Sequence, residues 1–119
     1  MPSYLLLIVE PRGQREARTP EQGRAAYEEM VRFGEGLAAQ GKLRGVSSLL
    51  PDRLGVRVRR REGKTELRDG TFAEAKEMIG GFFYIDCTDR DEALAIAAAC
   101  PAAQWATVEV REAAPCYEG

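Results

Sequence analysis

Six consecutive apolar residues, positions 4–9, stand near the start of this 119-residue chain. A continuous apolar run is typical of a strand buried on both faces, whereas a strand with one wet face alternates apolar and polar residues. Residues 81–86 form a second strand of this kind, in which positions 82–85 are apolar on both faces apart from the hydroxyl of Tyr84. The two runs predict strands that are buried on both faces.

A helix is predicted to begin at Thr19. Thr19 can cap the free N–H groups of the first turn, Pro20 suits that turn, and Gln22 completes a capping box. Apolar residues then recur at spacings of four and three, which places them on one helical face: Ala26, Met30, Phe33 and Leu37. Gly41 is the predicted end of this helix.

Three further strands are predicted in the middle of the chain: residues 43–50, residues 55–61 and residues 64–68. Val56 and Val58 alternate with arginines, so the second of these strands is expected to have one buried and one wet face. Glu62 and Gly63 can turn the chain between the second and the third strand. This part of the sequence therefore predicts a β-hairpin.

A second helix is predicted to start after Thr88 or Asp89, either of which can cap it, and to end at Pro101. Its buried side is expected to consist of Leu94, Ala97, Ala98 and Cys100. Residues 105–111 are predicted to form a last strand that turns the following side chains inward: Ala106, Val108 and Val110.

The order of these elements is strand, helix, strand, hairpin, strand, helix and strand. It predicts one domain over residues 1–119 with a ferredoxin-like α+β fold, in which two helices lie on one face of a mostly antiparallel sheet and a β-hairpin is added. Two helices cover only one face of the sheet, although the first strand and the aromatic strand are apolar on both of their faces. An identical sheet related by a two-fold axis would cover the other face, so we expect a homodimer of facing sheets.

The composition argues against several functions. A net charge of −2 does not suit a general polyanion-binding surface, so no nucleic-acid partner is expected. No uncharged stretch approaches the roughly 18 residues of a membrane span, so we expect no membrane partner and a cytoplasmic protein. Histidine is absent and the three cysteines lack Cys-x-x-Cys spacing, so we expect reduced thiols, no metal and no cofactor. An acid or base must then be a carboxylate, lysine, tyrosine or cysteine.

Four ionisable side chains are concentrated in residues 69–77 between turn-forming glycines. Asp69 can begin a tight turn, and an extended run beyond it would project Glu74 and Lys76 to one side. A carboxylate beside an ammonium can bind a zwitterionic or anionic ligand or hold a proton-transfer group, which makes Asp69, Glu74 and Lys76 candidate catalytic residues. Alternatively, Asp69 stabilises its own turn, and Lys76 pairs with Glu74 or Glu77 to hold the loop against the sheet.

This segment resembles the signature of the YCII-related proteins of DGPF type, in which Asp-Gly-Pro-Phe is followed by a Glu, a Lys and a Glu at these offsets and then by a Gly-Gly-aromatic strand. Further landmarks of that family recur along the chain: residues 4–7, residues 80–82, residues 91–93 and residues 108–111. The resemblance implies a dimeric ferredoxin-like α+β fold, of the dimeric α+β barrel type, for nearly the whole chain. It implies no particular reaction, because the family is largely without an assigned activity.

The chain departs from the resemblance at two points. Thr71 stands where the motif has proline, which frees the backbone angle that proline would fix. The related YciI branch has a His-Asp pair suggested to act in acid–base chemistry, and this chain has no histidine.

Secondary candidates lie outside the signature. Ser48 and Tyr84 can offer hydroxyls to a ligand pocket, or they are sheet residues with satisfied hydroxyls. Cys87 precedes a predicted helix start, where backbone N–H groups can lower the pKa of a thiol, or it is buried and inert. The basic run at residues 57–61 suits an anion-binding hairpin or a solvated edge that discourages aggregation.

Two functions remain as hypotheses. The first is a cofactor-free small-molecule enzyme or ligand binder with its site between the signature loop and the sheet, which predicts a concave pocket holding Asp69, Glu74 and Lys76. The second is a protein-interaction or regulatory module without catalysis, which the association of some family members with sigma factors implies. It predicts a closed fold with an exposed apolar patch.

Overall fold

The computed structural model describes residues 1–72 and 75–119. The strands of this part are β1 (Ser3–Pro11), β2 (Leu43–Ser48), β3 (Val56–Arg61), β4 (Lys64–Asp69), β5 (Glu77–Asp86) and β6 (Thr107–Glu112). The helices are α1 (Gln14–Ala17), α2 (Pro20–Ala39) and α3 (Arg90–Ala99), with the short 3-10 helices η1 (Asp52–Leu54) and η2 (Pro101–Gln104). All the predicted strands and helices are confirmed, whereas α1 and the two 3-10 helices carry no sequence signal that we recognised.

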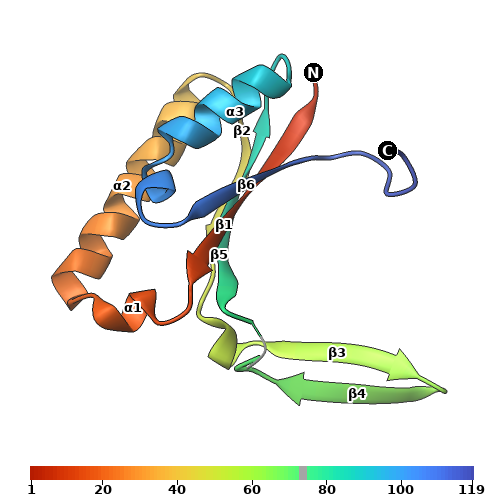
Figure 1. The fold of residues 1–119 in the computed structure, drawn as a ribbon. Coiled ribbons are helices and arrows are strands. Elements are labelled where there is room, and N and C mark those ends of the chain that lie inside the picture. The colour runs from red at the N-terminus through yellow and green to blue at the C-terminus, as the bar shows by residue number, and fades with distance from the viewer. Residues whose placement is uncertain (73–74) are drawn as a thin grey trace.

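Four strands form an antiparallel sheet in the order β2-β5-β1-β6, which is the ferredoxin-like arrangement. β1 lies between β5 and β6, so that Leu6 stands opposite both Phe83 and Val110. The long helices α2 and α3 lie on one face of the sheet, and no described helix lies on the other (Figure 1). The predicted fold class is confirmed.

The core lies between this sheet and the helices. Alternate residues of β1 point into it, and Leu6 is fully buried. Phe83 of β5 meets Phe33 of α2 edge to face, with the ring centroids 5.4 Å apart. A pair of this geometry stabilises by about 0.5–1.5 kcal/mol beyond the area it buries. It attaches the middle of α2 to the middle of the sheet.

α2 begins as the sequence predicts. Its first turn is closed by a reciprocal pair of hydrogen bonds: the backbone N–H of Gln22 donates to Thr19 Oγ1 at 3.1 Å, and the backbone N–H of Thr19 donates to Gln22 Oε1 at 2.9 Å. Gly41 has a φ of +71° just beyond the last turn, a conformation that favours glycine. Capping and termination are therefore both encoded locally.

The buried face of α3 differs in part from the prediction. Asp89 caps the helix by accepting from the backbone N–H of Glu92. The buried stripe runs through Ala93, Ala97 and Cys100. Leu94 and Ala98, which were expected inside, each follow a stripe residue by one position and are therefore turned toward solvent.

β3 and β4 form a separate two-stranded sheet, which we call the arm. It projects from the body on the side away from α2 and α3 (Figure 1). Glu62 and Gly63 both have positive φ and make the predicted turn. The expectation that one face of β3 is buried is wrong: Val56 and Val58 are 52% and 63% exposed, because the arm leaves the body and both of its faces are accessible.

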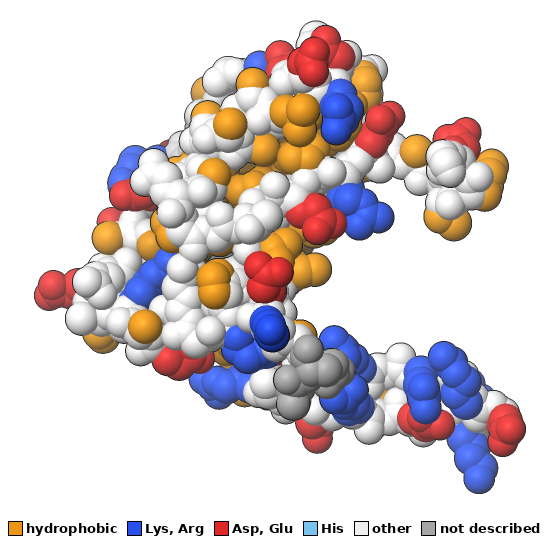
Figure 2. Space-filling view, viewed as in Figure 1, with side chains coloured by type: hydrophobic (Ala, Val, Ile, Leu, Met, Phe, Trp, Pro, Cys, Tyr) orange, Lys and Arg blue, Asp and Glu red, His pale blue; other side chains and the backbone are white. Residues whose placement is uncertain are grey.

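The sheet face away from the helices, here called the open face, is apolar along its centre. Leu5 and Leu7 of β1 pair with Tyr84 and Phe82 of β5, and all four side chains are half-buried. A recess separates this part of the body from the arm (Figure 2). The predicted apolar character of both faces is therefore present, and the open face of the single chain is still accessible to water.

Candidate functional site

A cavity of about 510 Å³ lies between α2 and the sheet. Its helical wall is a stripe of residues at spacings of three and four: Gly23, Ala26, Met30, Gly34 and Ala38. Most of these side chains are small, so they leave space between α2 and the strands β2 and β5. The volume falls within the roughly 300–1,000 Å³ of small-molecule sites.

A buried charge pair forms part of the cavity wall. Glu10 continues the inward alternation of β1 and is only 3% exposed. Arg15 of α1 places its Nε 2.5 Å from Glu10 Oε1. The terminal nitrogens of Arg15 donate to the carbonyl oxygens of Leu49 at 2.7 Å and Gly80 at 3.2 Å. An unpaired carboxylate at this depth costs several kcal/mol, and Arg15 supplies the opposite charge that Glu10 needs inside the fold.

Glu10 still has hydrogen-bonding capacity. Although Arg15 is close, Glu10 Oε1 has no aligned hydrogen bond to any described residue. A carboxylate oxygen can accept more than one hydrogen bond. Glu10 is thus a buried carboxylate in a mainly apolar cavity wall, and its pairing with Arg15 leaves part of its acceptor capacity unused.

Two glycines follow the signature, Gly80 and Gly81, and each position requires glycine for a different structural reason. A Cβ at position 80 would lie 2.7 Å from Cδ of Glu10 and 2.8 Å from Nη2 of Arg15. A Cβ at position 81 would lie 2.7 Å from the carbonyl oxygen of Ser47 on β2. The first glycine admits the charge pair, and the second permits the close approach of β2 to β5.

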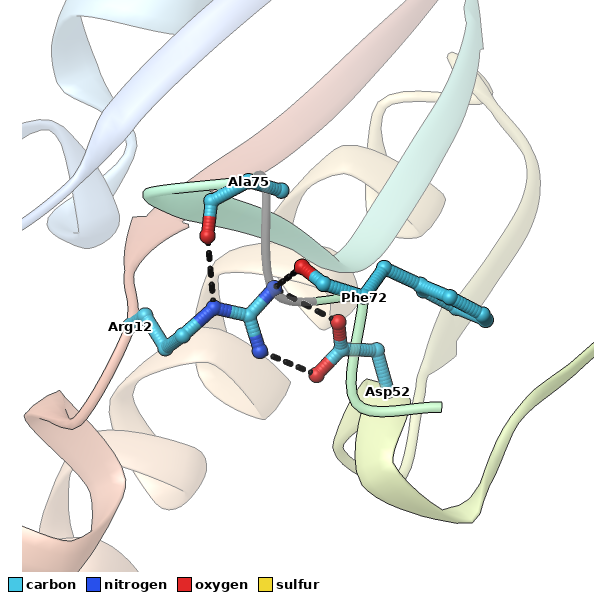
Figure 3. Close-up of polar contacts among 4 residues, drawn as sticks. All are labelled: Arg12, Asp52, Phe72 and Ala75. Carbon is cyan, nitrogen blue, oxygen red and sulfur yellow. Dashed lines mark hydrogen bonds and ion pairs between the residues drawn. The ribbon is translucent and has the colours of Figure 1, made fainter. Parts of the chain in front are cut away.

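Arg12 attaches the signature segment to the end of β1 (Figure 3). Its Nη1 and Nη2 each donate to one carboxylate oxygen of Asp52 at 2.7 Å. The Nε of Arg12 donates to the carbonyl oxygen of Ala75 at 2.8 Å, and the backbone N–H of Arg12 donates to the carbonyl oxygen of Lys76 at 3.0 Å. Since Arg12 directly follows β1, the strand that carries Glu10, the signature segment and the charge pair are built on one stretch of chain.

The contact with Arg12 also changes the titration of Asp52. Hydrogen bonds from the guanidinium, and in addition its positive charge, hold the pKa of Asp52 below the ordinary value of a carboxyl. Asp52 therefore stays ionised, and the anchor stays intact, to lower pH than an isolated aspartate would allow.

Phe72 closes the root of the arm. Its side chain is 7% exposed and lies beneath the guanidinium of Arg57, whose central carbon is 3.7 Å from the ring centroid. The backbone N–H of Gly70 donates to the carbonyl oxygen of Gly55 at 2.9 Å across the same root. A Cβ on Gly70 would clash with the carbonyl oxygen of Asp52. The Asp-Gly-x-Phe part of the signature therefore joins the arm to the body.

The predicted ligand-binding hydroxyls lie on opposite faces of the sheet. Ser48, at the end of β2, lines the cavity. Tyr84 lies on the open face, where Arg44 donates to its hydroxyl at 3.2 Å and stacks 4.6 Å from its ring centroid.

Two of the three predicted catalytic residues, Asp69 and Lys76, lie in the chain that leads from the arm back to β5. Asp69 is exposed at the end of β4, opposite Val56. Lys76 is exposed, and its side chain forms no ion pair with a described residue, so its carbonyl oxygen makes its contact with the body. Glu74 lies outside the described residues. Neither Asp69 nor Lys76 lines the cavity.

Cys87 is fully buried at the end of β5. Burial raises the pKa of its thiol, and the negative charges of Glu92 and Asp89 raise it further. These surroundings favour a protonated, unreactive thiol over a thiolate. Within residues 1–72 and 75–119, no three metal-ligating side chains are grouped to hold an ion.

Sequence reasoning missed Glu10, Arg12 and Arg15. Glu10 had a signal, because the alternation of β1 through Tyr4 and Ile8 places it on the buried face. Arg15 had none, since it lies on a single turn of helix that no apolar period predicts.

These observations define a ferredoxin-like α+β domain with a projecting arm and a ligand-sized cavity beneath α2. The sequence matches the YCII-related domain over residues 3–116, and the chain belongs to the YCII-related family. An uncharacterised protein of Rhizobium meliloti (strain 1021) is 46% identical over 54 residues, which are 45% of this chain and 44% of that protein. The predicted family is thus confirmed. In the part of the chain that is described, no helix has the length and apolarity needed to cross a membrane.

Proposed function

We propose that this protein is a small-molecule enzyme or ligand-binding protein that works without a cofactor, with its site in the cavity between α2 and the sheet. The observation that carries this proposal is Glu10, a carboxylate 3% exposed in a mainly apolar cavity wall. Replacing a buried ion pair by apolar residues is often neutral or stabilising, so stability alone is a weak reason for the Glu10–Arg15 pair. A hydrogen-bond acceptor facing a cavity is a sufficient chemical reason.

In this proposal the apolar part of the ligand lies along α2, and a donor group on the ligand binds Glu10. Ser48 supplies a further hydroxyl to the same cavity. The signature takes part in the site through Gly80, which leaves the space that Glu10 and Arg15 occupy. Asp69 and Lys76 remain candidates for a role at the root of the arm, and Glu74 remains a candidate site residue outside the described part of the chain.

A cavity-filling substitution tests the location of the site. Wild-type protein is expected to bind the neutral fluorophore N-phenyl-1-naphthylamine with a rise in fluorescence. Ala26→Phe should weaken that binding at least about tenfold, or about 1.4 kcal/mol, because the added ring occupies the cavity. Fluorescence titration measures both affinities.

Ala25→Phe is the matched control, because Ala25 is exposed on the same helix and does not line the cavity. It should bind the fluorophore as the wild type does. Unchanged affinity in Ala26→Phe, with the variant folded by circular dichroism, would place the ligand elsewhere.

The second candidate function is a protein-interaction or regulatory module, such as one associated with a sigma factor. Apolar side chains on the arm support it: Val58 and Leu67 lie opposite each other and are 63% and 68% exposed. The homodimer is a proposal of the same kind, supported by the half-buried apolar residues of the open face. Absence of any small-molecule binding to the wild type would favour this candidate.

A further inference from the structure

We infer that the ligand of this cavity is an elongated organic monoanion, a carboxylate with an apolar body, and that Arg18 binds its carboxylate. The inference rests on the proposed function and adds the chemical class of the ligand. Arg18 is half-buried and lines the cavity together with Trp105. Neither residue belongs to the signature.

The guanidinium of Arg18 is held in place by stacking. Its central carbon lies 4.4 Å from the centroid of the Trp105 ring. The backbone of Trp105 is itself fixed, because Gln14 Nε2 donates to the carbonyl oxygen of Trp105 at 2.6 Å and the backbone N–H of Trp105 donates to the carbonyl oxygen of Ala102 at 3.1 Å. Stacking orients the guanidinium plane and consumes none of its five N–H donors.

Arg18 differs from the two arginines that precede it on the same stretch. Arg12 is paired with Asp52, and Arg15 with Glu10. Among residues 1–72 and 75–119, no carboxylate lies within ion-pair distance of Arg18. Arg18 therefore presents an oriented cation, with its donors available, at the cavity wall.

The other charges of the cavity do not neutralise this cation. Glu10 is compensated by Arg15 at 2.5 Å. Glu35 also lines the cavity, but it is twelve residues beyond Gly23 on α2, which is about 18 Å along a helix axis. The N-terminus of α2, which begins two residues after Arg18, adds partial positive charge near it. This end of the cavity favours an anion.

The shape of the cavity and the single unpaired charge of Arg18 restrict the class of ligand further. The α2 wall runs from Gly23 to Ala38, about 22 Å along the helix, and is mainly apolar, which suits an extended apolar body. One unpaired guanidinium balances one negative charge, and its fork fits the two oxygens of a carboxylate. A monocarboxylate fits these features better than a dianion.

Octanoate and 1-octanol test the inference, because they share a chain and differ in the head group. Isothermal titration of the wild type should give a dissociation constant about tenfold or more lower for octanoate, as expected for charge-assisted hydrogen bonds. Arg18→Gln should abolish this preference while 1-octanol binds as before. Arg24→Gln is the control, since Arg24 is exposed on α2 and does not line the cavity, and it should keep the preference.

The ratio of the two affinities separates binding from a structural role, because a loosened fold would weaken both ligands alike. Arg18→Lys should keep part of the preference through its charge. Equal binding of both ligands to the wild type, or a preference that survives in Arg18→Gln, would overturn the inference and leave the proposed function standing. If neither ligand binds a wild type that does bind N-phenyl-1-naphthylamine, the inference fails and the proposed function stands; if the fluorophore does not bind either, both fail.

Discussion

Gly81 and Gly45 show how the space around a glycine in the four-stranded sheet determines whether a side chain fits there. A Cβ at position 81 would lie 2.7 Å from a backbone oxygen of β2, whereas at Gly45 the nearest atom is an ordinary 3.9 Å away. Gly81→Ala is therefore expected to lower the free energy of unfolding by about 1–3 kcal/mol through overpacking. Gly45→Ala should be neutral or stabilise by up to about 1 kcal/mol. Urea denaturation measures both, and equal values in the two variants would contradict the strand-approach explanation.

The residues that line the cavity were harder to predict from the sequence than the helices and strands that carry them. The signature drew attention to Asp69, Glu74 and Lys76, because charged residues between glycines are conspicuous in a sequence. The cavity wall instead contains Glu10 and Arg15, which are far from the signature in sequence and come close to Gly80 only after β1 pairs with β5. Contacts between residues so far apart in the sequence depend on tertiary packing, and the local periodicity of the sequence does not predict them.

At the scale of elements, the bidentate Arg12–Asp52 pair joins η1, the end of β1 and the signature segment. The pKa of Asp52 is lowered in the folded protein, so near and below the ordinary value of about 3.9 the unfolded state binds more protons, and stability must rise with pH there. The contribution is complete above that value and is lost as the pH falls through the folded pKa. Asp52→Asn should therefore be less stable than the wild type at pH 7, and the difference should shrink toward pH 2.

Denaturant midpoints at several pH values between 2 and 7 measure this difference. Glu118→Gln is the control, because Glu118 is exposed near the C-terminus and its removal should leave the curve unchanged. A constant gap between wild type and Asp52→Asn over the whole range would mean that the ion pair is not the cause.

Elements with local signals were predictable, and those without were not. The Thr19 capping box and the positive φ at Glu62 and Gly63 are encoded within a few residues, and the structure has them where the sequence places them. The burial of β3 was predicted wrongly, since alternation of Val56 and Val58 indicates a face that something covers and does not say what covers it. In a single chain, no described residue covers that face of β3.

At the scale of the whole molecule, the arm makes the chain less compact than its length requires. Its radius of gyration is 16.1 Å, against about 13–14 Å for a compact domain of this size. A two-stranded hairpin is marginally stable by itself in water, and the open face exposes Ile79 by 49%. Both features favour a partner that fills the recess between the arm and the body, and a second copy offers a matching open face.

Leu7→Glu tests the proposed homodimer at the centre of the open face, where Leu7 lies between Phe82 and Glu109. Wild-type protein should sediment at twice its 13.1 kDa mass at micromolar concentration. The variant should sediment as a monomer, because a buried unpaired carboxylate costs several kcal/mol and the new charge also faces Glu109. Leu94→Glu, on the exposed side of α3, should remain dimeric. A wild type that is monomeric in sedimentation equilibrium would remove the dimer, and with it the explanation for the apolar open face.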